Sequence, residues 1–211
     1  MQSVLRFAGS HDIEVILVDN ASRDETSIWA APLQHADGRV HVLRVSRTMG
    51  EAEARNIGLK QSRGRYILLL DSSVEVCGDV FTPLAEALAN EKIGITGLHG
   101  LHTDDLRHFE ESERAKVEVV DRLCMAFSRK LLKQVGLFDE GYRFPYYMDI
   151  DFNFAVRDRG AEIVVTPNLP LTCYPVQQYA DLSDAERTRL TKRNFYRFLE
   201  KWGDREDLLE E

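Results

Sequence analysis

Short apolar runs alternate with longer amphipathic stretches through the first hundred residues. Four runs rich in Val, Ile and Leu occupy residues 13–18, 39–45, 65–70 and 93–98. Runs this apolar are typical of parallel strands that are covered on both faces. The stretch between the second and third runs lacks proline and ends at Gly64, which indicates a helix. Strands and helices that alternate in this way predict an α/β fold.

Beyond residue 77 the pattern is less regular. Further elements are predicted in this order: a helix over 78–90, a polar aperiodic loop over 99–116, a strand over 116–128 and a short helix that ends at Gly136. Ser183 and Glu186 have the S-x-x-E spacing of a capping box, which indicates that a final helix begins there.

Composition and charge narrow the class of protein. The chain has 211 residues, of which 44% are apolar, and this length predicts a single domain over residues 1–211. A formal net charge of −8 argues against a nucleic-acid partner. No apolar run approaches the ~20 residues of a membrane span, and no charged-then-apolar leader opens the sequence. Cys77, Cys124 and Cys173 are widely spaced, which favours a reducing, cytoplasmic setting.

Two of the predicted strands end in a carboxylate, Asp19 and Asp71. Ligands of open parallel sheets bind beyond the carboxyl ends of the strands, where such a carboxylate can bind a ribose hydroxyl, a base N–H or a metal. The alternative is that each aspartate caps its own loop. The sequence contains no G-x-G-x-x-G and no G-x-x-x-x-G-K-[ST], so neither a dinucleotide fold nor a P-loop ATPase is supported.

A second acidic concentration lies at residues 139–151. Asp149 and Asp151 flank one residue there, and a carboxylate placed close to an acceptor hydroxyl can act as a general base. The alternative is a helix N-terminus, where the dipole favours acidic residues. Both interpretations stay open.

A third group combines histidines with aspartates in the predicted loop. Such residues can bind a metal, but their spacing matches no tight ligand pattern, and an ordinary polar loop is the favoured interpretation. The residues are His99, His102, Asp104, Asp105 and His108.

Five segments, taken in order, resemble the family 2 glycosyltransferases. They are EVILVDNASRDET, GEAEARNIGLKQSRGRYILLLDSS, CMAFSRKLLKQVGLFDEGY, YYMDIDFNFAVRDRG and NFYRFLEKWG. The resemblance implies the GT-A fold, a Rossmann-like α/β arrangement with a mostly parallel sheet flanked by helices. It implies a nucleotide-sugar-binding half over 1–98, an acceptor-side half over 99–180, and a C-terminal helix with an acidic tail over 181–211.

The resemblance also implies roles for particular residues. The donor would be a nucleotide-diphosphate sugar, transferred with inversion to an acceptor hydroxyl, with Mn²⁺ or Mg²⁺ as cofactor in an active enzyme. Asp149 would be the general base, with Asp151 beside it as a second catalytic candidate. Asp19 and Asn20 would contact the base and Asp71 the ribose. The full set implied to bind the nucleotide is Asp19, Asn20, Ser22, Arg55, Asn56 and Asp71.

The family's metal-binding DxD motif is altered in this chain. It has Asp71-Ser72-Ser73, so Ser73 replaces the carboxylate that normally holds the cation. A hydroxyl is a poor ligand for Mg²⁺ or Mn²⁺, and Glu75 is only a weak substitute. Without a cation, Asp71 and a diphosphate ~4 Å away would repel each other by about 4 kcal/mol at an effective dielectric of ~20.

Other departures fall on the acceptor side and on the first strand. Met148 replaces the acidic residue of the family's E-D motif, and Ala155 stands where an arginine is usual. Cys173 and Tyr174 stand where a histidine often follows the last strand. The family's opening strand, which lies between the strands that end at Asp19 and Asp71, is missing, and residues 1–12 resemble the end of the following helix. The two strands could pair directly, another chain could supply the strand, or Met1 could lie inside a longer protein.

Three hypotheses on function follow. The favoured one is a glycosyltransferase-like domain whose metal-dependent catalysis is impaired or lost, because Ser73 and Met148 alter the chemistry. The second is an active transferase that moves a sugar to an acceptor hydroxyl. The third is a structural module in which strand exchange makes a homo-oligomer or recruits a partner chain.

Overall fold

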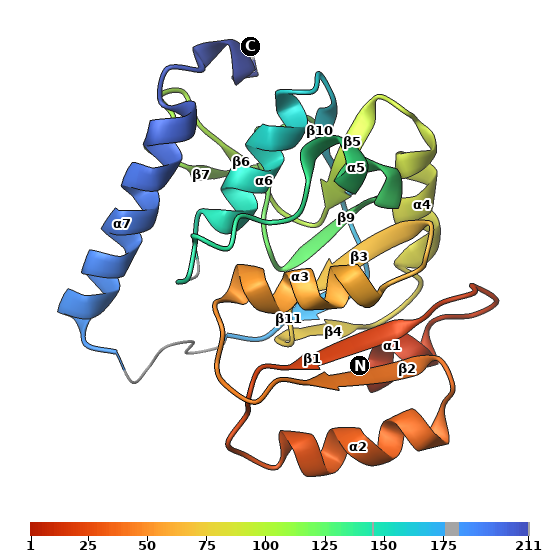
Figure 1. Ribbon diagram of the computed structural model, residues 1–211. Helices are drawn as coiled ribbons and strands as arrows, with labels where there is room; N and C mark the ends of the chain where they lie inside the picture. The colour runs from red at the N-terminus through yellow and green to blue at the C-terminus, as the bar shows by residue number, and fades with distance from the viewer. Residues whose placement is uncertain (145, 176–181, 211) are drawn as a thin grey trace.

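The computed structural model describes residues 1–144, 146–175 and 182–210 (Figure 1). The helices are α1 (Gln2–Arg6), α2 (Thr26–Ala36), α3 (Glu51–Gln61), α4 (Phe81–Ala89), α5 (Leu132–Val135), α6 (Met148–Arg157) and α7 (Asp184–Trp202), with short 3-10 turns at Arg129–Leu131 and Glu206–Leu208. The strands are β1 (Val15–Asp19), β2 (Val40–Arg44), β3 (Tyr66–Leu70), β4 (Val74–Val76), β5 (Ile93–Gly97), β6 (Gly100–His102), β7 (Glu110–Ser112), β8 (Val119–Val120), β9 (Cys124–Ser128), β10 (Glu162–Val165) and β11 (Leu171–Cys173).

The strands form one four-stranded sheet and three smaller ones. The four-stranded sheet has the order β10-β5-β9-β3, β1 pairs with β2, β4 pairs with β11, and β6 lies between β7 and β8. β5 and β10 are parallel, as are β1 and β2, whereas β9 is antiparallel to both of its neighbours. The chain leaves β5 at Gly97 and returns beside it as β9 from the same end of the sheet, where the Leu98 N–H donates to the Cys124 carbonyl. This return makes the sheet mixed.

The apolar runs of the first half form strands where the pattern predicts them, and the α/β class is confirmed. The helices predicted near residues 51–64, 78–90 and 183–203 are also present, and the Ser183–Glu186 capping box forms. Two predictions were wrong. The expected loop at 99–116 contains β6 and β7, and the single strand expected at 116–128 is split into β8 and β9. The boundary expected near residue 180 lies outside the described residues.

Helix α3 covers two strands that do not pair with each other. Gly58 faces Val18 of β1, while Leu59 belongs to the same apolar cluster as Ile67 of β3. Within the described residues, β1 pairs with β2 alone and β3 with β9 alone. Direct pairing of these two strands, the first of the three possibilities, was therefore wrong. A second chain or a longer form of this chain as the source of a strand stays a prediction.

Helix α7 packs against α6 along the edge of the molecule (Figure 1). The Phe154 and Phe198 rings meet edge to face with centroids 5.2 Å apart, and Trp202 lies against Phe154. The aromatic stripe of α7 is therefore a core contact. In the part of the chain that the structure describes, no helix has both the length and the apolar content needed to cross a membrane.

Gly97 brings β5 and the β8–β9 turn into close contact, and a side chain there should destabilise the fold. A Cβ at this position would lie 2.0 Å from the Cys124 carbonyl oxygen and 2.5 Å from Val120 Cγ1. We expect Gly97→Ala to lower the free energy of unfolding by about 1–3 kcal/mol, measured by urea denaturation. Gly38→Ala is the matched control, because nothing lies within 4 Å of its added Cβ. Equal stability of the two variants would contradict this account.

Candidate functional site

The carboxylate of Asp19, the last residue of β1, is buried and half satisfied. It is 2% exposed, and its Oδ1 accepts a 2.8 Å hydrogen bond from the Ser22 N–H. Its buried Oδ2 has no hydrogen-bond partner among the described residues, and Arg44 Nε approaches only to 3.6 Å. A buried carboxylate oxygen without a partner is costly and indicates a place for a ligand donor.

The loop after β1 is fixed by hydrogen bonds between the Asn20 side chain and the backbone of Met49. Asn20 Oδ1 accepts from the Met49 N–H at 2.8 Å, and Asn20 Nδ2 donates to the Met49 carbonyl at 2.9 Å. Ala21 follows with φ 57°, a left-handed conformation that is uncommon for a residue other than glycine. Asn20 thus fixes the loop beside Asp19, and its predicted contact with a base stays a prediction.

Asp71, which follows β3, is engaged on both oxygens. Its Oδ1 accepts from the Ser73 N–H at 2.9 Å and from the Ser73 hydroxyl at 2.7 Å. Its Oδ2 accepts from Arg122 Nη1 at 2.8 Å. Burial alone would raise the pKa of Asp71, but the Ser73 bonds and the charges of Arg122 and Arg55 hold that pKa below its ordinary value.

Asp71 belongs to a cluster of charged side chains that also contains Arg122, between β8 and β9, and Glu51 and Arg55 of α3. Arg55 donates from Nε and Nη2 to Glu51 Oε1 at 3.1 and 2.7 Å, and it also reaches the Arg122 carbonyl at 3.2 Å. Arg122 Nη1 lies 3.5 Å from the same Glu51 oxygen. Burial opposes the charged form of Arg122, but Glu51, Asp71 and Asp149 together raise its pKa.

Asp149 stands in the first turn of α6, as the helix-start interpretation predicts. The residue is 7% exposed, and burial raises the pKa of its carboxyl group against the opposing charges of Arg55 and Arg122. Tyr146 and Tyr147, directly before the helix, have φ 78° and 73°. Successive strained residues of this kind are often found at functional sites. Asp149 and Asp71 both raise the pKa of Arg122, so these three residues share one electrostatic cluster.

The residues at the DxD position do not fit a divalent cation. Asp71 is bonded to Ser73 and Arg122, and Glu75 instead accepts from the Tyr174 hydroxyl at 2.7 Å. No group of three His, Cys, Asp or Glu side chains that could hold a metal ion exists among the described residues. Mg²⁺ requires several oxygen ligands in near-octahedral geometry. Asp71 alone does not supply them, because both of its oxygens already accept hydrogen bonds.

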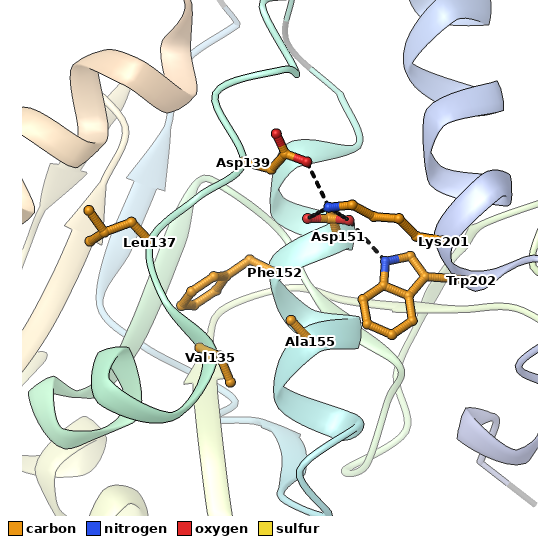
Figure 2. Close-up of a pocket in the computed structure, with 8 residues that line it drawn as sticks. All are labelled: Val135, Leu137, Asp139, Asp151, Phe152, Ala155, Lys201 and Trp202. Carbon is orange, nitrogen blue, oxygen red and sulfur yellow. Dashed lines mark hydrogen bonds and ion pairs between the residues drawn. The ribbon is translucent and has the colours of Figure 1, made fainter.

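Asp151 lies away from this cluster, in a pocket between α6 and α7 (Figure 2). Its carboxylate accepts from Lys201 Nζ and from Trp202 Nε1, both at 2.9 Å, and from the Tyr142 hydroxyl at 3.1 Å. Figure 2 shows Lys201 reaching between Asp151 and Asp139. These contacts anchor the C-terminal helix, and a catalytic role of Asp151 stays a prediction.

Asn56 also has a structural partner. The residue is buried, its Oδ1 accepts from the Phe138 N–H at 3.0 Å, and its Nδ2 donates to the Phe138 carbonyl at 2.9 Å and to Glu140 at 3.0 Å. The Asn56 side chain therefore joins α3 to the loop before α6. Its predicted contact with a nucleotide stays a prediction.

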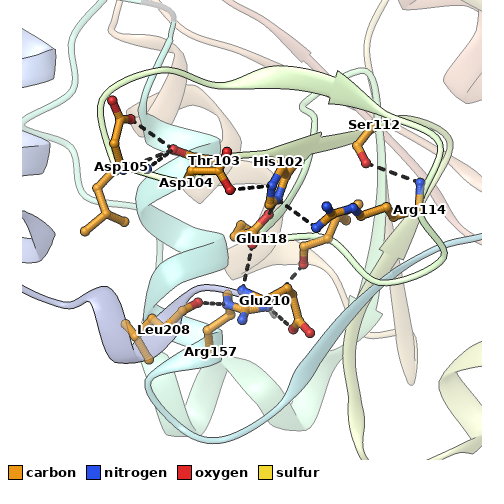
Figure 3. A network of polar contacts seen from close by, with 12 residues as sticks. His102, Thr103, Asp104, Asp105, Ser112, Arg114, Glu118, Arg157, Leu208 and Glu210 are labelled. Atoms are coloured by element: carbon orange, nitrogen blue, oxygen red, sulfur yellow. Dashed lines mark hydrogen bonds and ion pairs between the residues drawn. The ribbon is translucent and has the colours of Figure 1, made fainter.

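His102, one member of the histidine group, lies in a network of polar contacts (Figure 3). His102 lies between Glu118, 2.8 Å from its Nδ1, and Asp104, 3.0 Å from its Nε2. Glu118 is fully buried and also accepts from the Glu210 N–H at 2.8 Å. His108 pairs separately with Asp105. His102 belongs to β6, so these side chains form a polar network on a strand and the turn after it, and through Glu118 the network contacts the C-terminal segment.

Arg122 and Glu51 were missed in the sequence. Arg122 stands in the turn between β8 and β9, inside a stretch that the pattern predicts as one strand. The sequence signal is the pair Asp121-Arg122, two charged residues that interrupt an otherwise apolar segment. Such an interruption is typical of a turn that presents polar side chains rather than of a buried strand.

Comparisons with known proteins bear on the family and the fold of the chain. The family model described as Glycosyl transferase family 2 matches residues 1–151. The succinoglycan biosynthesis protein ExoO of Rhizobium meliloti (strain 1021) is 34% identical over 139 residues, which cover 64% of this chain and 39% of ExoO. The uncharacterized protein y4gI of Sinorhizobium fredii (strain NBRC 101917 / NGR234) is 26% identical over 197 residues, 79% of this chain and 22% of y4gI. The chain thus spans less than half the length of these relatives.

Two solved structures share the fold. The crystal structure of GalNAc-T7 with UDP, GalNAc and Mn²⁺ superposes with a TM-score of 0.77 at 18% identity, over 97% of this chain and 45% of that one. The mannosyltransferase PcManGT from Pyrobaculum calidifontis, in complex with GDP-Man and Mn²⁺, superposes with a TM-score of 0.68 at 18% identity, over 95% and 58%. The family match covers well over half of the sequence and the fold is GT-A. The chain therefore belongs to glycosyl transferase family 2.

Proposed function

We propose that this chain binds a nucleotide-diphosphate sugar at the carboxyl ends of β1 and β3, and that the family's metal-dependent transfer is impaired in it. The observation that carries the binding site is Asp19, whose buried Oδ2 has no hydrogen-bond partner in the described part of the chain. The two similar structures hold UDP or GDP-Man together with Mn²⁺, which supports a nucleotide ligand for this fold.

The orphan oxygen of Asp19 suits one part of such a ligand. A nucleobase carries N–H donors on its hydrogen-bonding edge, and a donor from the base would satisfy the buried carboxylate. Asp71 follows β3, the other strand that α3 covers, and would bind the ribose hydroxyls. The diphosphate would then extend towards Arg122 and Asp149.

Impaired transfer follows from the state of Asp71 and Ser73. In metal-dependent transfer, a divalent cation stabilises the charge of the leaving diphosphate, a contribution of several kcal/mol. Here the Ser73 hydroxyl donates to Asp71, and Glu75 is bonded to Tyr174. We infer that the residues at this position do not support the step that Mn²⁺ or Mg²⁺ supplies elsewhere in the family.

The second candidate is an active transferase, and Asp149 favours it. A carboxylate with a raised pKa is a better general base towards a hydroxyl than an ordinary aspartate. Asp149 also lies within the electrostatic cluster that contains Asp71 and Arg122. In this case Asp149 would accept the proton of the acceptor hydroxyl as the sugar transfers.

Replacement of Asp19 tests the nucleotide site. Asp19→Asn keeps an oxygen for the Ser22 N–H but replaces the orphan acceptor with a donor, so we expect nucleotide binding to weaken by about 10- to 100-fold. The measurement is calorimetric titration with UDP, GDP and dTDP. Asp37→Asn, before β2 at the opposite end of the β1–β2 pair, is the control and should bind like the unmodified chain. Tight nucleotide binding that Asp19→Asn leaves unchanged would contradict this site.

Replacement of Asp149 distinguishes the two candidate functions. Under the favoured proposal, neither the unmodified chain nor Asp149→Asn releases sugar from UDP-glucose or GDP-mannose, and both bind nucleotide equally. Under the alternative, the unmodified chain hydrolyses or transfers the sugar, and Asp149→Asn lowers the rate by about 10²- to 10⁴-fold. Coupled detection of the released nucleoside diphosphate measures both.

The same variant has an expected effect on stability. Because burial raises the pKa of Asp149 above 3.8, the folded state binds this proton more tightly than the unfolded chain. The free energy of unfolding therefore loses a contribution as the pH rises from about 4 through the raised pKa. We expect Asp149→Asn to be more stable than the unmodified chain at pH 7.5, by a margin that shrinks towards pH 4 in urea denaturation. A margin independent of pH would argue against a buried, ionised Asp149.

A further inference from the structure

We propose that the guanidinium of Arg122 takes the place of the divalent cation and binds the diphosphate of the donor without metal. This inference rests on the proposed nucleotide site. The family binds a divalent cation through a carboxylate at the position of Ser73, and this chain has a hydroxyl there. Arg122, from the turn between β8 and β9, places a positive charge 2.8 Å from Asp71.

The turn that carries Arg122 is firmly placed at the carboxyl end of β3. The Asp71 N–H donates to the Leu123 carbonyl at 2.9 Å, and the Asp121 N–H donates to the His99 carbonyl at 3.1 Å. Asp121 Oδ1 in turn accepts from the Leu123 N–H at 3.0 Å. The guanidinium is therefore preorganised beside Asp71, and its side chain remains 18% exposed, so a ligand can reach it from solvent.

The contacts of Arg122 differ in strength, and this difference leaves one of them open to exchange. The 2.8 Å bond to Asp71 has the length of a good charge-assisted hydrogen bond, whereas the 3.5 Å contact to Glu51 is long. Glu51 keeps Arg55 as a partner, whose Nη2 and Nε both donate to Glu51 Oε1, at 2.7 and 3.1 Å. A phosphate oxygen can thus replace Glu51 at Arg122 while Asp71 and Glu51 both keep hydrogen-bond partners.

A guanidinium has the properties that this position requires. It stays charged at every physiological pH, it is weakly hydrated, and its planar fork matches phosphate oxygens. It also neutralises Asp71, which removes the repulsion between that carboxylate and an incoming diphosphate. Arg122 is therefore a binding residue that supplies a positive charge and oriented N–H donors. Arg55 supports it by remaining hydrogen-bonded to Glu51.

The test compares diphosphate binding with nucleoside binding in the presence of EDTA or Mn²⁺. We expect the unmodified chain to bind the preferred nucleoside diphosphate in EDTA, with less than about a two-fold change on adding Mn²⁺. Arg122→Gln removes the charge but keeps a donor for Asp71, and should weaken diphosphate binding about 10- to 100-fold in calorimetry. Binding of the matching nucleoside, followed by amide NMR shifts, should not change. Arg122→Lys should recover part of the loss.

Two further variants sharpen the test. Arg39→Ala removes an arginine paired with Asp37, before β2 at the opposite end of the β1–β2 pair, and should leave diphosphate binding unchanged. Ser73→Asp combined with Arg122→Gln restores the second carboxylate, and should make binding at least 10-fold tighter with Mn²⁺ than with EDTA. Diphosphate binding would then depend on Mn²⁺ only in the variant that has lost the charge of Arg122 and gained a carboxylate at position 73.

The outcomes separate the two proposals. If the unmodified chain binds diphosphate only with Mn²⁺, or if Arg122→Gln binds it as well as the unmodified chain in EDTA, the role of Arg122 is overturned while the nucleotide site stands. If Arg122→Gln weakens the nucleoside and the diphosphate equally, Arg122 has only a structural role. If no nucleotide binds the unmodified chain under any condition, the nucleotide site itself fails, and the inference fails with it.

Discussion

A carboxylate beside a diphosphate needs a positive charge, and in this chain the charge nearest to Asp71 is an arginine. The 2.8 Å bond between Arg122 and Asp71 joins two parts of the sequence 51 residues apart and determines what else can occupy the end of β3. With Ser73 on one oxygen and Arg122 on the other, Asp71 is held in its ionised form and its pKa stays low. In the site that we propose, this arginine would supply the positive charge that a cation supplies elsewhere in the family.

The fold places this arginine through backbone contacts rather than through side-chain packing. Gly97 allows β5 to approach the Cys124 carbonyl, and the chain can then turn back into the sheet as antiparallel β9. The turn between β8 and β9 is bonded to Asp71 and His99, so Arg122 cannot shift without disturbing the central sheet. An exposed lysine on a flexible loop would provide charge without position.

The sequence predicts the carboxylates of the site better than it predicts the cations. Asp19 and Asp71 each follow an apolar run, and Asp149 lies in a segment whose paired aspartates are typical of a helix N-terminus. Each therefore has a local sequence pattern. Arg122 has only the weak signal of the charged pair Asp121-Arg122, and its role depends on a partner 51 residues away. β6 and β7 were missed for a similar reason: they are short, β7 is exposed, and cross-strand bonds rather than apolar content define them. Asn56 has a family pattern, yet the bonds that occupy it come from Phe138, 82 residues on.

Several strained or costly features lie at the end of β1 and at the start of α6, although Leu106 and Asn168 also have positive φ elsewhere. Asp19 has an orphan buried oxygen, Asp149 has a raised pKa, and Ala21, Tyr146 and Tyr147 have positive φ. Buried carboxylates elsewhere, such as Asp151 and Glu118, are fully bonded. A fold retained only as a scaffold gains nothing from the unpartnered Oδ2 of Asp19, whose burial without a hydrogen bond is a cost to stability. The unpartnered Oδ2 of Asp19 therefore favours a site that still binds a ligand over a purely structural module.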